Sequence, residues 1–91
     1  MKYCSYTTGT IVDIIDNIND MYKFITIAKK PGDIYTYTIL VYSQKTIILN
    51  HEYNEISVDD LNIGDTIVAF HSNAMTMSIP PQTSVYIIEV K

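Results

Sequence analysis

Arginine and tryptophan are absent from this chain of 91 residues, and cysteine occurs once, as Cys4. A single cysteine excludes a disulfide bond within the chain. Six lysines stand against ten acidic residues, so the net charge is −4. Affinity for phosphate backbones and anionic lipids comes mainly from lysine and arginine. This balance therefore argues against a protein that binds duplex DNA, RNA or a membrane surface.

Long hydrophobic runs are also missing. No apolar stretch approaches the roughly 20 residues that a transmembrane helix needs. The first ten residues contain no apolar segment of the kind found in signal peptides, so we expect a cytoplasmic protein. The length suits a single domain, residues 1–91, which would bury roughly 60–65% of the surface that its unfolded chain exposes.

The apolar residues that are present favour strands. Isoleucine is abundant, and eight tyrosines stand beside two phenylalanines. β-Branched and aromatic side chains suit a pleated, half-buried surface, whereas alanine, the best helix former, is scarce. Six segments bounded by turn-forming residues are predicted as strands: residues 8–15, 21–28, 34–42, 46–49, 66–70 and 83–90.

Alternation within these segments predicts which side chains face the core. In the first strand, Val12 and Ile14 share one face. In the last strand, Tyr86, Ile88 and Val90 form the apolar face. Between the two, Leu61 and Ile63 are expected to point inward.

Residues 11–25 admit two interpretations. The polar residues 16–20, which are mostly turn formers, separate two strand-like runs and predict a hairpin. The apolar residues of the same stretch also fall on one helical stripe, and periodicity alone leaves that helix open. The many β-branched residues and the central asparagines and aspartates favour the hairpin.

A short helical turn is predicted near residues 57–61. Ser57 can cap it, and Asp60 lies at the offset of a capping box. Gly64 then allows a tight turn into the next strand. The sequence therefore predicts an all-β domain, a small five-stranded OB-like barrel with this one helical turn. Closure of such a barrel removes exposed strand edges.

The loop before the last strand is the unusual part of the chain. Two consecutive prolines, Pro80 and Pro81, remove two backbone donors and exclude a central strand. A stiff extended segment with neighbouring apolar groups can present a recognition surface at low entropic cost. The predicted binding loop comprises Met75, Met77, Ile79, Pro80, Pro81 and Gln82.

Three stretches, residues 9–14, 60–65 and 75–82, together resemble small OB-like β-barrel domains of Firmicutes, especially clostridia. The Leu-x-x-Gly-Asp element at residues 61–65 is common to many barrels, and the Met-Thr-x-Ser-x-Pro-Pro-Gln loop is the specific part. The resemblance covers nearly the whole chain. It implies the barrel fold and no particular activity.

Metal binding is one alternative function. Met75-Thr76-Met77 is similar to the methionine pair of the small periplasmic copper/silver chaperones of resistance efflux systems. Thioether and imidazole groups are soft ligands that select Cu(I) or Ag(I), so His71, Met75 and Met77 form a candidate metal site. Methionines that fill the open end of a barrel are the competing interpretation.

Binding of single-stranded nucleic acid is a further alternative, because aromatic side chains on an OB-type face can stack bases. The tyrosines considered for this role are Tyr22, Tyr35, Tyr37, Tyr42, Tyr53 and Tyr86. The acidic net charge makes nucleic acid an unfavourable partner. No catalytic constellation is present in the sequence, so we expect a non-enzymatic binding or accessory module without a cofactor. Its ligand would be a protein partner or a small molecule, and the sequence leaves a homodimer open.

Overall fold

The computed structural model describes residues 4–16 and 22–91. Within these ranges the chain forms seven strands and two 3₁₀ turns. In order these elements are β1 (Cys4–Asp16), β2 (Lys23–Ala28), η1 (Ile34–Thr36), β3 (Tyr37–Tyr42), β4 (Ile47–Leu49), β5 (Glu55–Ile56), η2 (Val58–Asp60), β6 (Thr66–Ser72) and β7 (Gln82–Val90).

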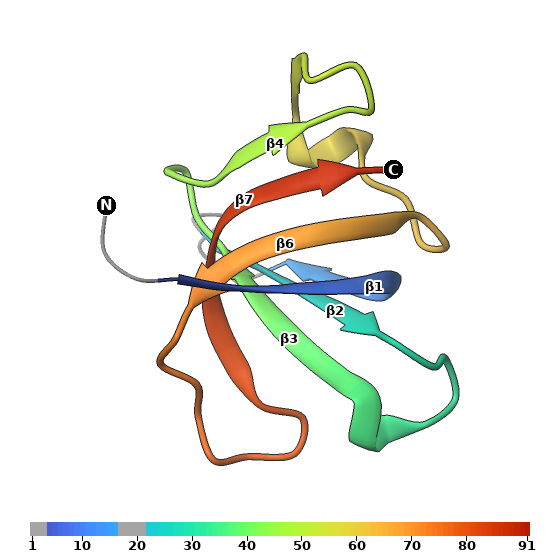
Figure 1. The fold of residues 1–91 in the computed structure, drawn as a ribbon, viewed down its shortest axis with the longest axis vertical. Coiled ribbons are helices and arrows are strands. Elements are labelled where there is room, and N and C mark those ends of the chain that lie inside the picture. Colours follow the sequence, from blue (N-terminus) through green and yellow to red (C-terminus); the bar gives the residue numbers. More distant parts are fainter. Residues whose placement is uncertain (1–3, 17–21) are drawn as a thin grey trace.

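Five of these strands close into a barrel (Figure 1). Around the barrel the order is β3, β2, β1, β6 and β7, and the circle is completed where β7 pairs with β3. This closing pair is parallel and joins residues 39–41 to residues 82–84, whereas the other four pairs of the barrel are antiparallel. The predicted all-β, five-stranded barrel is therefore confirmed. The short strands β4 and β5 extend the sheet beyond β7.

The hairpin interpretation of residues 11–25 is confirmed, and the helix is wrong. β1 and β2 pair antiparallel from Thr10 opposite Ala28 to Asp16 opposite Lys23. Of the predicted turn, Asp16 is the last residue of β1, and residues 17–20 lie outside the described residues.

The register of this hairpin explains why a helix looked plausible. Ile11 pairs with Ile27 and Asp13 with Thr26, so Val12 is an extra residue in a β-bulge. A bulge shifts the alternation by one residue. Ile11 and Ile14 consequently both pack in the core, three residues apart as on a helix face. The expectation that Val12 shares a face with Ile14 is wrong, because Val12 is not part of the core cluster.

A second bulge corrects the predicted face of the last strand. Phe70 pairs with Ile87 and His71 with Val85, which leaves Tyr86 unpaired on this side. Val85 and Ile88 are buried, while Tyr86 points outward and is 42% exposed. Tyr86 therefore does not belong to the apolar core face where the alternation had placed it.

Branched aliphatic side chains fill the barrel. The largest fully buried side chains are those of Ile11, Ile25, Ile27, Leu40, Ile48, Ile67 and Ile88. Leu61 joins this core as predicted, but Ile63 is 66% exposed. The reason is the tight turn that follows, where Gly64 takes a φ of 102° and its N–H donates to the carbonyl of Ile11. Ile63 lies at the tip of this turn and projects into solvent.

The two 3₁₀ turns begin at polar caps. Ser57 and Asp60 form the predicted capping box of η2, which is confirmed. η1 was not expected, because residues 34–36 had been assigned to the following strand. Asp33 accepts a hydrogen bond from the N–H of Tyr35, and this cap holds the chain in a turn before β3 begins.

Candidate functional site

The β6–β7 loop, residues 73–81, lies at one end of the barrel. β3 and β7 run parallel, so the segments that precede them lie at the same end. Figure 1 shows the β6–β7 loop and the β2–β3 connection side by side at the bottom of the molecule. The structure thus brings two loops together that are distant in sequence.

Hydrogen bonds within the loop fix its shape. The backbone N–H of Thr76 donates to the carbonyl of Gln82 (3.0 Å), and the N–H of Gln82 donates to Thr76 Oγ1 (2.9 Å). Inside this closed ring, the hydroxyls of Thr76 and Ser78 are 2.6 Å apart, and Ser78 Oγ donates to the carbonyl of Pro80 (2.9 Å). The hydroxyls of Thr76 and Ser78 are therefore engaged with the loop itself, whereas Asn73 Oδ1 accepts a hydrogen bond from Ser5 Oγ of β1.

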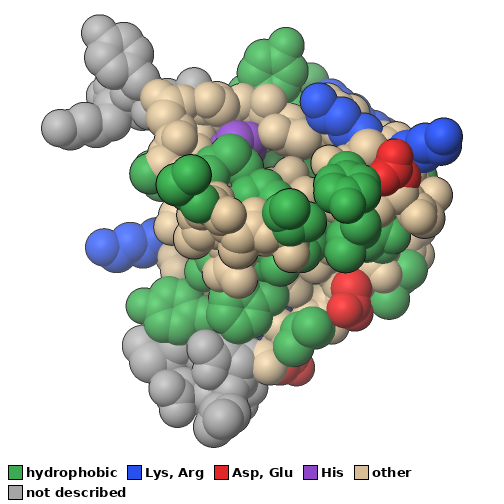
Figure 2. Space-filling view, turned by 90° about the horizontal axis from the view of Figure 1, so that it is seen from below, with side chains coloured by type: hydrophobic (Ala, Val, Ile, Leu, Met, Phe, Trp, Pro, Cys, Tyr) green, Lys and Arg blue, Asp and Glu red, His purple; other side chains and the backbone are tan. Residues whose placement is uncertain are grey.

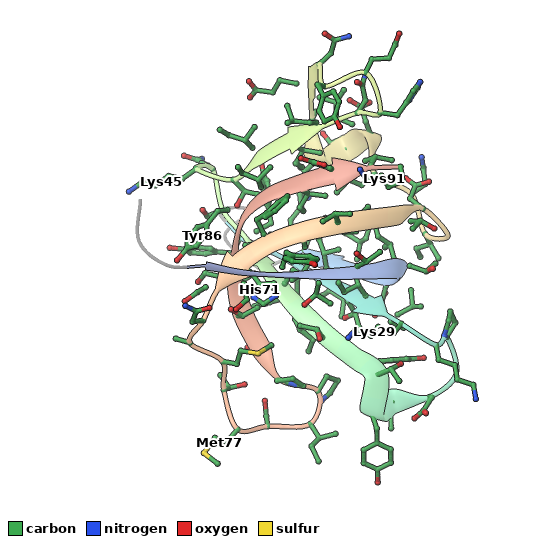
Figure 3. All side chains as sticks on the ribbon, in the orientation of Figure 1. Lys29, Lys45, His71, Met77, Tyr86 and Lys91 are labelled. Carbon is green, nitrogen blue, oxygen red and sulfur yellow. The ribbon has the colours of Figure 1, made fainter. Side chains whose placement is uncertain are left out.

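The apolar side chains of the loop remain exposed. Met77 at the tip is fully exposed and points away from the barrel (Figure 3), and Ile79 is 67% exposed. Ile34 and Tyr35 of η1 are exposed on the neighbouring connection. Figure 2, which views this end of the molecule, shows hydrophobic side chains gathered at its centre and charged ones mainly at its margin. We call Ile34, Tyr35, Met75, Met77 and Ile79 the apolar end.

The predicted binding loop divides into two parts. Met75, Met77 and Ile79 belong to the apolar end. The half-buried Pro80, Pro81 and Gln82 form its base: the carbonyl of Pro81 accepts from the N–H of Ile39 (2.9 Å), and Gln82 begins β7. The Ile79–Pro80 peptide bond is cis. The second part therefore attaches the loop to the closing strand pair.

The candidate copper ligands lie in different surroundings. His71 is only 3% exposed and occupies the core side of β6. Its Nε2 lies 2.8 Å from Thr7 Oγ1, and its Nδ1 lies 2.9 Å from the carbonyl of Ser72. Both ring nitrogens thus have partners inside the fold. Figure 3 shows Met77 at the loop tip, well separated from His71.

The tyrosines do not form one face. Tyr53 lies in the connection between β4 and β5, Tyr35 belongs to the apolar end, and Tyr42 packs against the core. The hydroxyl of Tyr37 accepts from the N–H of Gly32 (3.1 Å). Tyr22 and Tyr86 both line one hollow in the surface.

Two hollows adjoin along the closing strand pair. One has a volume of about 370 Å³, and we call it the tyrosine hollow. It is lined by Tyr22, Val41, Ser43, Gln44, Lys45, Ser84, Val85 and Tyr86. The other, of about 380 Å³, continues from Val41 and Ser84 to Met75 and Thr76. No motif predicted the tyrosine hollow, since it depends on the bulge at Tyr86.

Metal clusters and membrane helices are not evident in the part of the chain that the structure describes. Residues 4–16 and 22–91 contain no group of three or more His, Cys, Asp or Glu side chains that could hold a metal ion. The same residues form no helix with the length and hydrophobicity to cross a membrane.

Comparison with protein-family profiles, curated proteins and solved structures gives no match for this chain.

Proposed function

We propose that this chain is a non-enzymatic binding module that holds a protein partner through the apolar end. The observation that carries the proposal is the β6–β7 loop. The hydroxyls of Thr76 and Ser78 hydrogen-bond within the loop, while Met77 and Ile79 stand exposed. Protein interfaces are built around a few apolar anchors that become desolvated in the complex.

The preformed shape of the loop favours high affinity for a partner that buries Met77 and Ile79. Ordering a flexible loop on binding costs free energy, and a loop already closed by hydrogen bonds avoids part of that cost. Full burial of a methionine or isoleucine side chain contributes roughly 1.5–3 kcal/mol. Met77 and Ile79 together can therefore supply about 3–6 kcal/mol of binding free energy.

The architecture supports the same location. We assign the barrel to the OB type, because it has five strands in Greek-key order and is closed by its third and last strands. In OB barrels the loop between the fourth and fifth strands is one of the ligand-binding loops, and here that loop is residues 73–81. This support is an analogy of fold.

A matched pair of variants tests the proposal. Ile79 and Ile63 are equally exposed, at 67% and 66%, but Ile63 lies in the turn before β6, outside the apolar end. A partner recovered on the immobilised protein, identified by mass spectrometry and purified, should bind Ile79→Ala at least about tenfold more weakly, a loss of roughly 1.4 kcal/mol. Ile63→Ala should bind like the unmodified protein.

The triple variant Met75→Ala/Met77→Ala/Ile79→Ala gives the decisive reading. It should keep the circular dichroism spectrum and thermal midpoint of the parent, because none of the three side chains belongs to the buried core. Its affinity for the purified partner should fall by two orders of magnitude or more. Undiminished affinity of a folded triple variant would refute the proposal.

A further inference from the structure

The tyrosine hollow originates where the sheet changes partners. β3 and β4 pair in turn with the same edge of β7, β3 at residues 82–84 and β4 at residues 87–89. Between these pairings, Val85 and Tyr86 have no strand beside them on that edge, and the chain detours through residues 43–46. The bulge at Tyr86, on the opposite edge of β7, turns the Tyr86 ring outward, and the ring lines this gap.

The walls of the hollow are fixed. The detour is a turn in which the N–H of Thr46 donates to the carbonyl of Ser43 (3.0 Å), and the N–H of Ser43 donates to Thr46 Oγ1 (3.1 Å). The buried hydroxyl of Thr46 also donates to the carbonyl of Val85 (2.8 Å). This bond ties the turn to β7, so the fold sets where the backbone of Lys45 lies relative to β7.

The side chains that line the hollow favour a ligand with a particular chemistry. Tyr22 and Tyr86, 43% and 42% exposed, present two partly accessible rings. Lys45 is the one charged side chain among the described residues that line either hollow, although the chain is acidic overall. The part of the chain that the structure describes offers Lys45 no ion-pair partner. Figure 3 shows Lys45 and Tyr86 projecting on the same side of the molecule.

We propose that the tyrosine hollow binds a small planar aromatic molecule that carries a single carboxylate. The ring packs against Tyr22 and Tyr86, and the carboxylate pairs with Lys45. The volume lies in the range of small-molecule sites. One lysine on a protein of net charge −4 suits one negative charge, because a polyanion would meet repulsion without further cations. Gln44, Ser43 and Ser84 supply the polar groups that orient such a ligand.

The proposal is tested with 2-naphthoate as the charged probe and 2-naphthylmethanol as its neutral counterpart. Titrations followed by ¹H–¹⁵N NMR should show 2-naphthoate binding with a Kd of about 1 mM or lower, a value typical of a ligand of this size. The shifts should centre on Tyr22, Lys45 and Tyr86. Shifts centred elsewhere, or none at ten times that concentration, would overturn the proposal.

Variants separate the role of the charge from that of the rings. Lys45→Met should raise the Kd of 2-naphthoate about three- to tenfold and leave that of the alcohol unchanged. The control Lys29→Met, at the end of β2, should change neither Kd. Tyr86→Leu should weaken both probes. Equal weakening of both probes by Lys45→Met would show that the lysine does not pair with the carboxylate.

This site does not depend on the proposed protein partner. The apolar-end variant Ile79→Ala should bind 2-naphthoate with the Kd of the unmodified protein, because Ile79 lines neither hollow. Undiminished partner binding by Ile79→Ala would count against the apolar end alone, and absence of 2-naphthoate binding by the unmodified protein would count against the tyrosine hollow alone, so the two failures are distinguishable.

Discussion

His71 occupies a place in the barrel that the alternation of β6 reserves for an apolar side chain. Ile67 and Ala69 precede it on the same face, and all three are buried. A carbonyl can only accept a hydrogen bond, so Nδ1 donates to Ser72. In the neutral ring Nε2 then accepts from the hydroxyl of Thr7. The imidazole thus provides a partner for a half-buried hydroxyl at this end of the barrel.

His71→Leu should destabilise the protein by about 1–3 kcal/mol, because the hydroxyl of Thr7 loses its partner. Urea denaturation measures the change. The matched control is His51→Leu, which alters an exposed residue in the β4–β5 connection and should change stability by less than about 0.5 kcal/mol.

A second variant tests the cause of that loss. His71→Leu/Thr7→Val replaces both hydrogen-bonding partners with apolar groups and should recover most of the lost stability. Thr83 Oγ1 lies 2.9 Å from both the Ser72 and the Ala74 carbonyls, so its single hydrogen can serve Ser72 in either variant. A double variant as unstable as the single one would show that the Thr7 bond is not the origin of the effect.

At the scale of elements, the β6–β7 loop depends on one hydroxyl. Thr76 Oγ1 accepts from the N–H of Gln82 at the neck of the loop and contacts Ser78 Oγ within it. Loops without such bonds are ordered only when a partner binds, and they lose affinity through the entropy of ordering. A substitution at Thr76 can therefore change the order of the loop while its apolar side chains stay the same.

Thr76→Val should loosen the loop while the barrel stays folded. We expect a stability loss of about 1 kcal/mol and a fall in the NMR order parameter of the Met77 amide from about 0.85 toward 0.6. Thr8→Val, a change at an exposed site on β1, serves as the control and should leave that order parameter unaltered. A rigid loop in Thr76→Val would mean that the backbone hydrogen bond between residues 76 and 82 is enough to keep the loop ordered.

The sequence predicts most strands but neither bulge. Branched residues and turn formers identify the elements because these signals are local. A bulge is defined by the partner strand, so nothing in the sequence near Val12 or Tyr86 shows that a residue there is skipped. The apolar loop was predictable from its methionines and prolines. The tyrosine hollow was not, since it joins Tyr22, Lys45 and Tyr86 from three separate parts of the chain.

At the scale of the whole molecule, the barrel is held together unevenly. β1 and β6 are paired over seven residues, from Cys4 opposite Ser72 to Thr10 opposite Thr66. The closing pair of β3 and β7 joins only residues 39–41 to residues 82–84 and is parallel, the less stable arrangement per residue. The barrel should therefore open first along this pair.

Native-state hydrogen exchange can detect this opening. The N–H of Ile39 donates to the carbonyl of Pro81 across the closing pair, so it reports on that pair directly. Its opening free energy should lie about 1–2 kcal/mol below that of the core amides of β6, which exchange only when the fold opens more widely. Equal protection of Ile39 and the β6 amides would show that the barrel opens as one unit.

The same closing pair has a consequence during synthesis. About 40 residues separate the end of β3 from the start of β7, and at about 5–20 residues per second the ribosome needs roughly 2–8 s to produce them. Throughout that interval the nascent β1–β2–β3 sheet carries the unpaired edge of β3, which can pair with a neighbouring nascent chain. The yield of closed barrel should accordingly depend on how fast the message is read and how closely ribosomes follow one another along it.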